Sequence, residues 1–417
     1  MPAQKKPAAD CLSDNALQHF KTYKYSSVDK SPISYYILRH YWNACVEFLP
    51  LWLHPNMVTL LGFLFILANV GLMEIKDPDL LGPKETWVYY SYAFGVWAYS
   101  TLDNIDGKQA RRTGMSSGLG ELFDHGIDSL NCLLASILQT SAVGLGSTPL
   151  GAFTAAVPTI PMFFSTWETY HTHTLYLGYF NGPTEGLIGA SLLMWSSGYF
   201  GNETWRRPLA DLFGFRSILG DTSIIDVWVP VLLLLLAVGH IPACMYNVLQ
   251  ARRAKNLPFL PVLLEWTPML VFCGGLTAWL GSPYSNLLRD NHLCLLCLTL
   301  SFVFGRMTTK IILAHLTRQP FPYWTGLLLP LIGGAALVNL PYLGFDPVSA
   351  TLEHYYLWAY FLIAMIVYFR WAYLVINGIC DYLGIPCLTI PEERWRALER
   401  ERRGEVNGAA LNGKKIR

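Results

Sequence analysis

The sequence predicts an all-α, polytopic integral membrane protein. Of its 417 residues, 53% are hydrophobic and only 14% are charged, whereas soluble domains carry roughly 25% charged residues. The apolar residues gather in stretches of about 20, the length that an α-helix needs to cross the hydrocarbon core of a bilayer. A formal net charge of +1 indicates neither nucleic acid nor another polyanion as a partner.

Ten such stretches are expected to span the membrane. They cover residues 56–74, 88–110, 119–144, 149–169, 183–200, 225–248, 260–281, 291–315, 323–341 and 354–378. Ahead of them, residues 31–52 mix aromatic and apolar side chains with Arg39, His40 and Glu47. This pattern is typical of an amphipathic helix that lies in the membrane interface, and a helix packed on the protein is the alternative.

The organisation that follows has four parts. We expect a polar N-terminal segment at 1–30, the interfacial amphipathic helix at 31–52, one transmembrane domain at 53–380 and a charged C-terminal tail at 381–417. Residues 1–30 lack the apolar core of a signal peptide, so targeting is expected to depend on the first span.

An even number of spans places both termini on the same side. That side receives six lysine or arginine residues from its loops and eight from the tail, whereas the other side receives six. The positive-inside rule then predicts that both termini face the cytosol, together with the turn that contains Arg111 and Arg112. On the same topology the N-E-T sequon at Asn202 faces the lumen.

Four aspartates lie inside two neighbouring spans. Asp103 and Asp106 are about one helical turn apart near the end of the second span, and Asp124 and Asp128 are similarly spaced near the start of the third. A charged side chain at the centre of a membrane helix costs on the order of 2.5–3.5 kcal/mol. Because carboxylate oxygens select hard cations, the sequence predicts a site for one or two Mg²⁺ or Mn²⁺ ions.

A buried ion-pair network or a cation pathway is the alternative for this segment. Counting Glu121, five acidic groups stand against three basic ones, Lys108, Arg111 and Arg112, and this excess of anions favours a metal site. Arg111, with the other two basic groups behind it, is expected to contact a metal-bound diphosphate. The pattern therefore indicates phosphoryl transfer at the membrane surface.

The residues from Asp103 to Asp128 follow the spacing D-x2-D-G-x2-A-R-x8-G-x3-D-x3-D without exception. This spacing resembles the signature of the CDP-alcohol phosphatidyltransferase family. The flanking segments H-P-N-M-V-T (54–59), D-G-K-Q-A-R-R-T (106–113) and T-W-E-T-Y-H-T-H (166–173) are similar to those of the eukaryotic choline and ethanolamine phosphotransferases, fungal members in particular.

The resemblance implies transfer of phosphocholine, phosphoethanolamine or both from CDP-choline or CDP-ethanolamine to sn-1,2-diacylglycerol, with release of CMP. It implies that Asp103, Asp106, Asp124 and Asp128 bind two divalent ions. It further implies a homodimer in endoplasmic reticulum or Golgi membranes. The residues expected to border the CDP-alcohol are Asn56, Gly107, Ala110, Arg111, Gly120 and Glu121.

The general base that takes the proton of the diacylglycerol hydroxyl is either His125 or Asp128. An imidazole with a pKa near 6.5 suits the task at cytosolic pH. Asp128 is the residue that the family resemblance implies, but a carboxylate shared with metal is a poorer base. We therefore favour His125.

Two further groups of residues have two interpretations each. Trp167, Glu168, Tyr170, His171 and His173 either contact a quaternary ammonium head group or form an aromatic belt. Arg306, Lys310 and His315 in the eighth span either extend toward the interface or contact lipid phosphate or a second subunit.

Intramembrane carboxylates also line the cavities of secondary transporters and cation channels, so a transporter or channel is the alternative to an enzyme. The sequence does not separate choline from ethanolamine.

Overall fold

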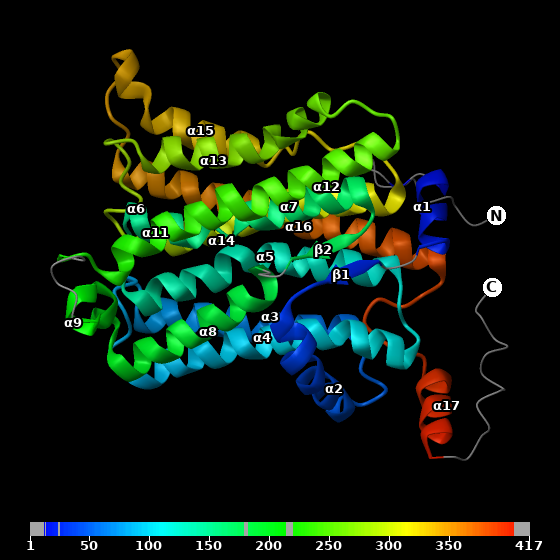
Figure 1. Cartoon of the computed structure of the whole chain (residues 1–417). Coiled ribbons are helices and arrows are strands. Elements are labelled where there is room, and N and C mark those ends of the chain that lie inside the picture. Colours follow the sequence, from blue (N-terminus) through cyan, green and yellow to red (C-terminus); the bar gives the residue numbers. More distant parts are fainter. Residues whose placement is uncertain (1–11, 13, 24–25, 179–181, 214–219, 404–417) are drawn as a thin grey trace.

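Long helices run roughly side by side through most of the computed structural model (Figure 1). It describes residues 12, 14–23, 26–178, 182–213 and 220–403. Within these residues, five helical stretches are long and apolar enough to cross a membrane: Pro55–Lys76, Ile224–Ala254, Leu260–Leu280, Leu293–Thr317 and Ala350–Leu383. The described strands are β1 (Ser27–Asp29) and β2 (Leu175–Leu177), which form one short parallel pair. The predicted all-α membrane fold is confirmed.

Each of the ten predicted spans has a helical counterpart in the described residues. Six of them are single helices: α3 (Pro55–Lys76), α4 (Thr86–Thr113), α5 (Gly118–Val143), α8 (Gly182–Phe200), α14 (Leu293–Thr317) and α16 (Ala350–Leu383). The helix α16 is longer than its predicted span, because the Ser349 hydroxyl caps it at its start and Gly384 ends it in the left-handed region.

The other four predicted spans are interrupted or short. Residues 149–169 form α6 (Pro149–Ala156) and α7 (Thr159–Thr172), and residues 225–248 form α11 (Ile224–Leu234), a π-helical stretch (Leu235–His240) and α12 (Ile241–Ala254). Residues 260–281 form a 3₁₀ stretch (Leu260–Trp266) and α13 (Thr267–Leu280), and residues 323–341 contain α15 (Leu328–Val338). Proline, which lacks a backbone N–H, lies at or near the first three interruptions at Pro158, Pro230 and Pro268.

The helix α15 differs most from its prediction. Its 11 residues have a length of roughly 16 Å at 1.5 Å per residue, about half of the hydrocarbon thickness. A 3₁₀ turn (Leu340–Leu343) follows it. The apolar composition of 323–341 predicted a span, but only part of this segment is helical.

The predicted interfacial helix corresponds to a π-helical stretch (Ser34–Leu38) and α2 (Arg39–Phe48). Trp42 and Val46 are buried against the protein, whereas Tyr36 and Phe48 are 72% and 87% exposed. In Figure 1, α2 diverges from the long helices. The segment therefore packs on the protein with one face and presents large apolar side chains on another, as a helix in the membrane interface would.

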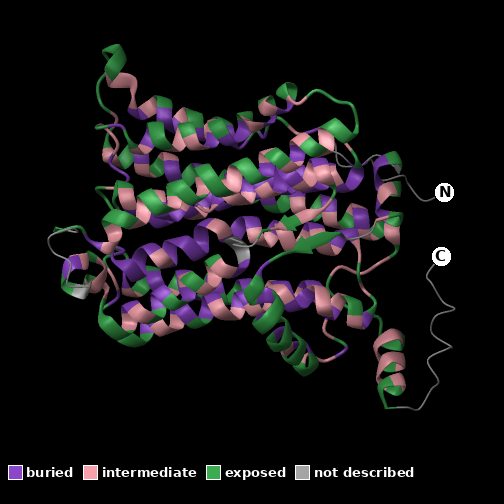
Figure 2. Ribbon diagram, viewed as in Figure 1, coloured by how far each residue is buried: buried purple, intermediate pink, exposed green. Residues whose placement is uncertain are grey.

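The helices α5 and α14 form the centre of the bundle, and buried residues concentrate along them (Figure 2). They approach closely at Gly305, where an added Cβ atom would lie 2.8 Å from Leu130 Cδ2. Arg306 also lies on α14, where its guanidinium stands 5.7 Å from the ring centre of Trp371 and Nη1 donates to Thr325 Oγ1 at 3.4 Å. These contacts hold Arg306 against neighbouring side chains of the bundle.

The remaining described helices lie at the two ends of the bundle. At one end are α1 (Asp14–Lys21), α17 (Glu392–Arg402) and the turn between α4 and α5 (Figure 1). At the other end are a 3₁₀ stretch (Asn202–Arg206) and α9 (Leu209–Phe213). The aspartate motif and the sequon asparagine thus lie at opposite ends, as the predicted topology requires. Which end faces the cytosol, and the four-part division of the chain, remain predictions; residues 1–11 and 404–417 lie outside the described residues.

Candidate active site

A short turn brings the two acidic segments to the same end of the bundle. The helix α4 ends at Gly114, whose backbone has φ 65° and whose N–H bonds to the carbonyls of Ala110 and Arg111. The next helix, α5, starts after Ser117, whose Oγ accepts a hydrogen bond from Gly120 N at 3.2 Å. Only four residues separate the helices, so the end of α4 lies beside the start of α5.

The structure brings the four predicted aspartates together. The carboxylate of Asp124 lies close enough to those of Asp103, Asp106 and Asp128 to be repelled by each of them. Asp106 is buried and the other three are half-buried. Four like charges at this separation are unfavourable unless a cation lies among them.

Two atoms of this cluster lack partners. Asp103 Oδ1 and Asp124 Oδ1 are buried and have no hydrogen-bond partner within the described part of the chain. The other two aspartates are held by hydroxyl groups: Thr59 Oγ1 donates to Asp106 Oδ2, and Tyr99 OH donates to Asp128 Oδ1.

Glu353, a buried carboxylate elsewhere in the molecule, has hydrogen-bond donors at both of its oxygens. Glu353 accepts hydrogen bonds from Trp279 Nε1 at 2.9 Å, Ser285 Oγ at 2.7 Å and Asn286 N at 2.7 Å. A buried acceptor without a partner costs free energy and is rare in native proteins. The partnerless oxygens of Asp103 and Asp124, in an excess of negative charge, therefore fit a hard divalent cation.

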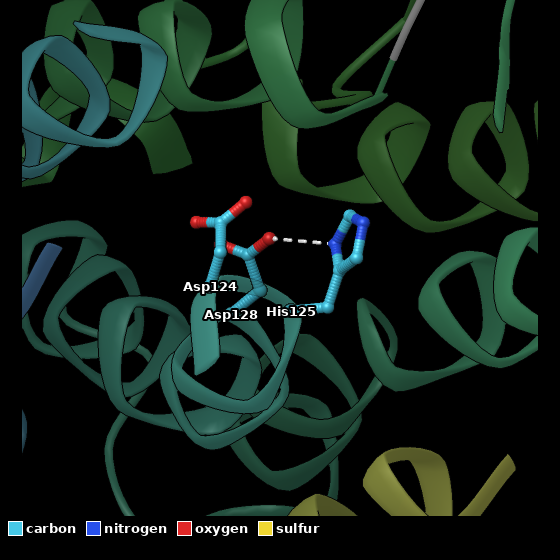
Figure 3. A group of neighbouring side chains, drawn as sticks. All are labelled: Asp124, His125 and Asp128. Atoms are coloured by element: carbon cyan, nitrogen blue, oxygen red, sulfur yellow. Dashed lines mark ion pairs between the residues drawn. The ribbon is translucent and has the colours of Figure 1, made fainter. Parts of the chain in front are cut away.

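His125 lies beside the aspartates of α5. Figure 3 shows Asp124, His125 and Asp128 projecting from this helix, with an ion pair of 3.5 Å between His125 Nδ1 and Asp128 Oδ2. The three side chains can each offer one ligand atom within 4.8 Å of the others. The sequence predicted an oxygen-only ligand set, and this geometry adds a ring nitrogen as a second kind of ligand atom.

Asn56 and Gly120, two of the residues predicted to border the nucleotide, lie together. A Cβ atom added at Gly120 would be 3.8 Å from Asn56 Oδ1. The backbone N–H of Asn56 donates to His54 Nδ1 at 3.1 Å, and burial lowers the pKa of His54 to about 4, so the ring is neutral and can accept. The side-chain amide of Asn56 donates to the carbonyl oxygen of Cys387 at 2.9 Å.

Gly107 and Arg111 border open space. A Cβ atom at Gly107 would meet only Arg111 Nη1, at 3.7 Å. Arg111 is exposed, and among the described residues its guanidinium forms neither a hydrogen bond nor an ion pair. Glu121, in contrast, faces α14, with its Oε1 3.9 Å from His315 Nε2. Gly107 and Arg111 are therefore accessible to a ligand, Ala110 is half-buried, and Glu121 already has a neighbour.

Lys108 and Arg112, which were predicted to support Arg111 at a diphosphate, contact the segment of α2 instead of Arg111. Lys108 Nζ donates to Asn43 Oδ1 at 2.8 Å. Arg112 Nη1 donates to the carbonyls of Val46 at 2.9 Å and Leu49 at 2.7 Å. Cations are favourable at the C-terminal end of a helix, where carbonyl groups lack partners. Arg112 binds the end of α2 in this way, whereas Lys108 contacts a side-chain amide within α2.

Most of the aromatic segment in α7 is internal. Trp167 is fully buried, and its Nε1 donates to Glu265 Oε2 at 2.7 Å. The same oxygen lies 2.6 Å from His171 Nε2, and Glu168 accepts from Asn247 Nδ2 at 2.6 Å. These contacts leave Trp167, His171 and Glu168 unable to enclose a head group, so packing explains them.

Sequence reasoning assigned no role to Thr59 and Tyr99. The sequence nevertheless contained an indication for each residue. Tyr99 precedes Asp103 by four residues on α4, which places the two on one helix face, and Thr59 belongs to the 54–59 segment that carries Asn56. Their partners, Asp128 and Asp106, lie on other helices, which a single sequence does not reveal.

Membrane helices that gather four carboxylates at one end of a bundle define a class of membrane protein with a candidate metal site. Comparison with known proteins identifies the class more closely: the model of the CDP-alcohol phosphatidyltransferase family matches residues 52–178. The chain belongs to this family, and it is a multi-pass membrane transferase of phospholipid synthesis.

Characterised relatives extend this similarity over most of the chain. The choline/ethanolaminephosphotransferase 1 of Arabidopsis thaliana is 34% identical over 88% of this chain and 95% of its own. The cholinephosphotransferase 1 of Saccharomyces cerevisiae is 36% identical over 75% of this chain and 80% of its own, and the human ethanolaminephosphotransferase 1 is 31% identical over 79% and 83%. The identities to the plant, yeast and human proteins are similar. They therefore do not single out the fungal members, to which the sequence motifs were predicted to be most similar.

Proposed function

We propose that this protein transfers phosphocholine, phosphoethanolamine or both from a CDP-alcohol to the free hydroxyl of sn-1,2-diacylglycerol, releasing CMP. The observation that carries the proposal is the meeting of the four motif carboxylates at one end of the bundle. The relatives are named as phosphotransferases of choline, of ethanolamine or of both, and these names support this pair of head groups.

Mg²⁺ or Mn²⁺, as two ions, is the proposed cofactor. Asp103, Asp106, Asp124 and Asp128 would hold the ions, and the partnerless oxygens of Asp103 and Asp124 support this assignment. Bound divalent ions neutralise the charge of a diphosphate and so make its cleavage easier.

The remaining roles fall to the protein's own side chains. Arg111 binds the diphosphate, while Gly107, Ala110 and Gly120 leave room for the nucleotide beside Asn56. His125 takes the proton of the diacylglycerol hydroxyl, and Asp128 orients the imidazole through the contact at 3.5 Å. The hydroxyl oxygen then attacks the phosphorus that carries the amino alcohol, and CMP leaves with the electrons of the broken bond.

We further propose that the catalytic end and both termini face the cytosol, that the enzyme resides in the endoplasmic reticulum or Golgi membrane, and that it is a homodimer. The basic side chains of α17, at the same end as the motif (Figure 1), support the orientation through the positive-inside rule.

The test is release of CMP by the purified protein in lipid nanodiscs. We expect CMP from CDP-choline or CDP-ethanolamine only when diacylglycerol and Mg²⁺ or Mn²⁺ are both present, and we expect EDTA to stop it. A competition between the two CDP-alcohols then measures the head-group preference. Absence of CMP release with either substrate, together with ion flux through reconstituted protein, would support a channel or transporter instead.

Thr59 provides a test of how the aspartates are oriented. Removing its hydroxyl in Thr59→Val deprives Asp106 of the donor from α3, and loss of such a supporting hydrogen bond typically weakens metal affinity by about 10- to 100-fold. We expect the Mg²⁺ concentration for half-maximal activity to rise by about this factor, while Thr59→Ser stays near the wild type. Equal Mg²⁺ requirements for valine and serine would remove Thr59 from the metal site.

A further inference from the structure

The chain that follows α16 returns across the end of the bundle that carries the aspartates. Gly384, with φ 66°, ends α16, and Ile385 N donates to Cys380 O at 3.2 Å, so the chain reverses direction. Thr389 then pairs with Leu53 in an isolated β-bridge. Residues 384–402, here called the C-terminal strap, thus run past the loop that precedes α3.

The C-terminal half of the strap is hydrogen-bonded to the turn between α4 and α5, the two helices that carry the aspartates. Arg394 Nε donates to Thr113 O at 3.0 Å, and Nη2 of the same side chain donates to Gly114 O. Arg402 Nη2 lies 2.7 Å from Glu47 Oε2 of α2. The strap therefore contacts the start of α3, the end of α4 and α2.

Cys387 is the point where the strap meets the proposed nucleotide site. Asn56 Nδ2 donates to the carbonyl oxygen of Cys387 at 2.9 Å and to its Sγ at 3.7 Å. The other side-chain atom of Asn56, Oδ1, lies near Gly120. A displacement of Cys387 would therefore change the position of Asn56.

A second thiol lies against Cys387. Cys380, in the last turn of α16, and Cys387 pack against the same hydrophobic cluster, and their side chains interact. Both cysteines are free and half-buried. The hydrogen bonds from Cys380 and Asn56 lower the pKa of the Cys387 thiol, although burial opposes them. A thiol whose pKa is lowered is the more reactive member of such a pair.

We propose that Cys380 and Cys387 are a reversible oxidation site, at which a hydroperoxide converts the two thiols into a disulfide that weakens CDP-alcohol binding. The Cys387 thiolate attacks the peroxide oxygen and becomes a sulfenic acid, and Cys380 Sγ then displaces water to form the S–S bond. Two thiols lose two electrons and two protons, and hydrogen peroxide is reduced to two water molecules.

The effect on the substrate follows from the geometry of the bond. A disulfide requires the sulfur atoms to lie about 2.05 Å apart with a dihedral angle near 90°, so Cys387 Sγ moves toward Cys380 and the contacts of Cys387 with the amide of Asn56 change. This part of the inference rests on the proposed function of Asn56. In a compartment where thiols are kept reduced, disulfides are usually transient. A disulfide that forms on oxidation and is later reduced is consistent with such a compartment.

The experiment combines peptide mapping with kinetics on the full-length protein in nanodiscs. After hydrogen peroxide, we expect a peptide with Cys380 linked to Cys387, and a KM for CDP-choline or CDP-ethanolamine raised about tenfold, the equivalent of one lost hydrogen bond. Dithiothreitol should reverse both. Cys380→Ser should keep the basal KM and lose the response, whereas Cys45→Ser on α2 should respond as the wild type does.

The outcomes separate the two parts of the inference. A map without the 380–387 linkage would overturn the oxidation site, and a linkage that leaves KM unchanged would overturn its effect on the substrate. If the reduced protein uses neither CDP-alcohol, the proposed function fails, while the peptide map still reports on the thiol pair.

Discussion

Asp124→Asn is expected to lower kcat/KM for CMP release by at least about a thousandfold. The carboxylate of Asp124 lies among the other three aspartates, and its Oδ1 is buried without a partner in the described residues. An amide cannot replace a charged ligand, and loss of several kcal/mol of electrostatic stabilisation corresponds to a factor of this size. The measurement is CMP release at saturating diacylglycerol over a range of Mg²⁺ concentrations.

A second readout distinguishes a lost ligand from a damaged fold. Because Asp124 is repelled by its three neighbours, its neutralisation relieves like-charge repulsion when no metal is bound. We expect the unfolding temperature of Asp124→Asn in EDTA to be no lower than that of the wild type, and its rise on addition of Mg²⁺ to be smaller.

The matched control is Asp346→Asn, which changes the same side chain at an exposed position outside the site. It should leave activity and the Mg²⁺-dependent rise in unfolding temperature unchanged. Activity of Asp124→Asn within tenfold of the wild type would contradict the proposed metal site.

The part of this site that could be predicted from sequence is the part that helix geometry fixes locally. Asp103 and Asp106 share a face of one helix, and Asp124 and Asp128 share a face of the next, because each pair is three or four residues apart. The short turn at Gly114 then requires the two faces to lie near each other. The four carboxylates were predicted as a cluster, and the structure places them as one.

The part that could not be predicted depends on partners distant in sequence. Glu265 lies 94 residues from His171, and Cys387 lies 331 residues from Asn56. The spacing around Lys108 and Arg112 gave no indication that α2 would bind them. A charge pattern shows which groups need a partner, but only the packed bundle selects the partner.

A similar division holds for the fold. Apolar length located all ten helical segments, since burial in hydrocarbon requires about 20 apolar residues wherever a helix crosses it. It did not separate a continuous helix from an interrupted one. The proline at 158 was visible in the sequence and coincides with the break between α6 and α7, whereas the shortness of α15 has no comparable signal.

His125→Ala is expected to reduce kcat by about 100- to 10,000-fold, the usual contribution of a general base, with little change in the affinity for CDP-choline or CDP-ethanolamine. The imidazole lies beside Asp128, with Nδ1 3.5 Å from Oδ2. Among the described residues Nε2 has no hydrogen-bond partner, so this nitrogen is the one assigned to take the proton. The measurements are single-turnover rates of CMP formation and equilibrium binding of the CDP-alcohol to the same preparation.

The geometry offers His125 a second role that the same variant tests. Its ring nitrogen lies within 4.8 Å of ligand atoms of Asp124 and Asp128, so it can also serve as a metal ligand. If His125 is the general base, His125→Ala lowers kcat at every Mg²⁺ concentration. If His125 is a metal ligand, the variant raises the Mg²⁺ concentration required for activity and reduces the metal-induced rise in unfolding temperature. Loss of CDP-alcohol binding would instead assign His125 a structural role, and an unchanged kcat would transfer the role of base to Asp128.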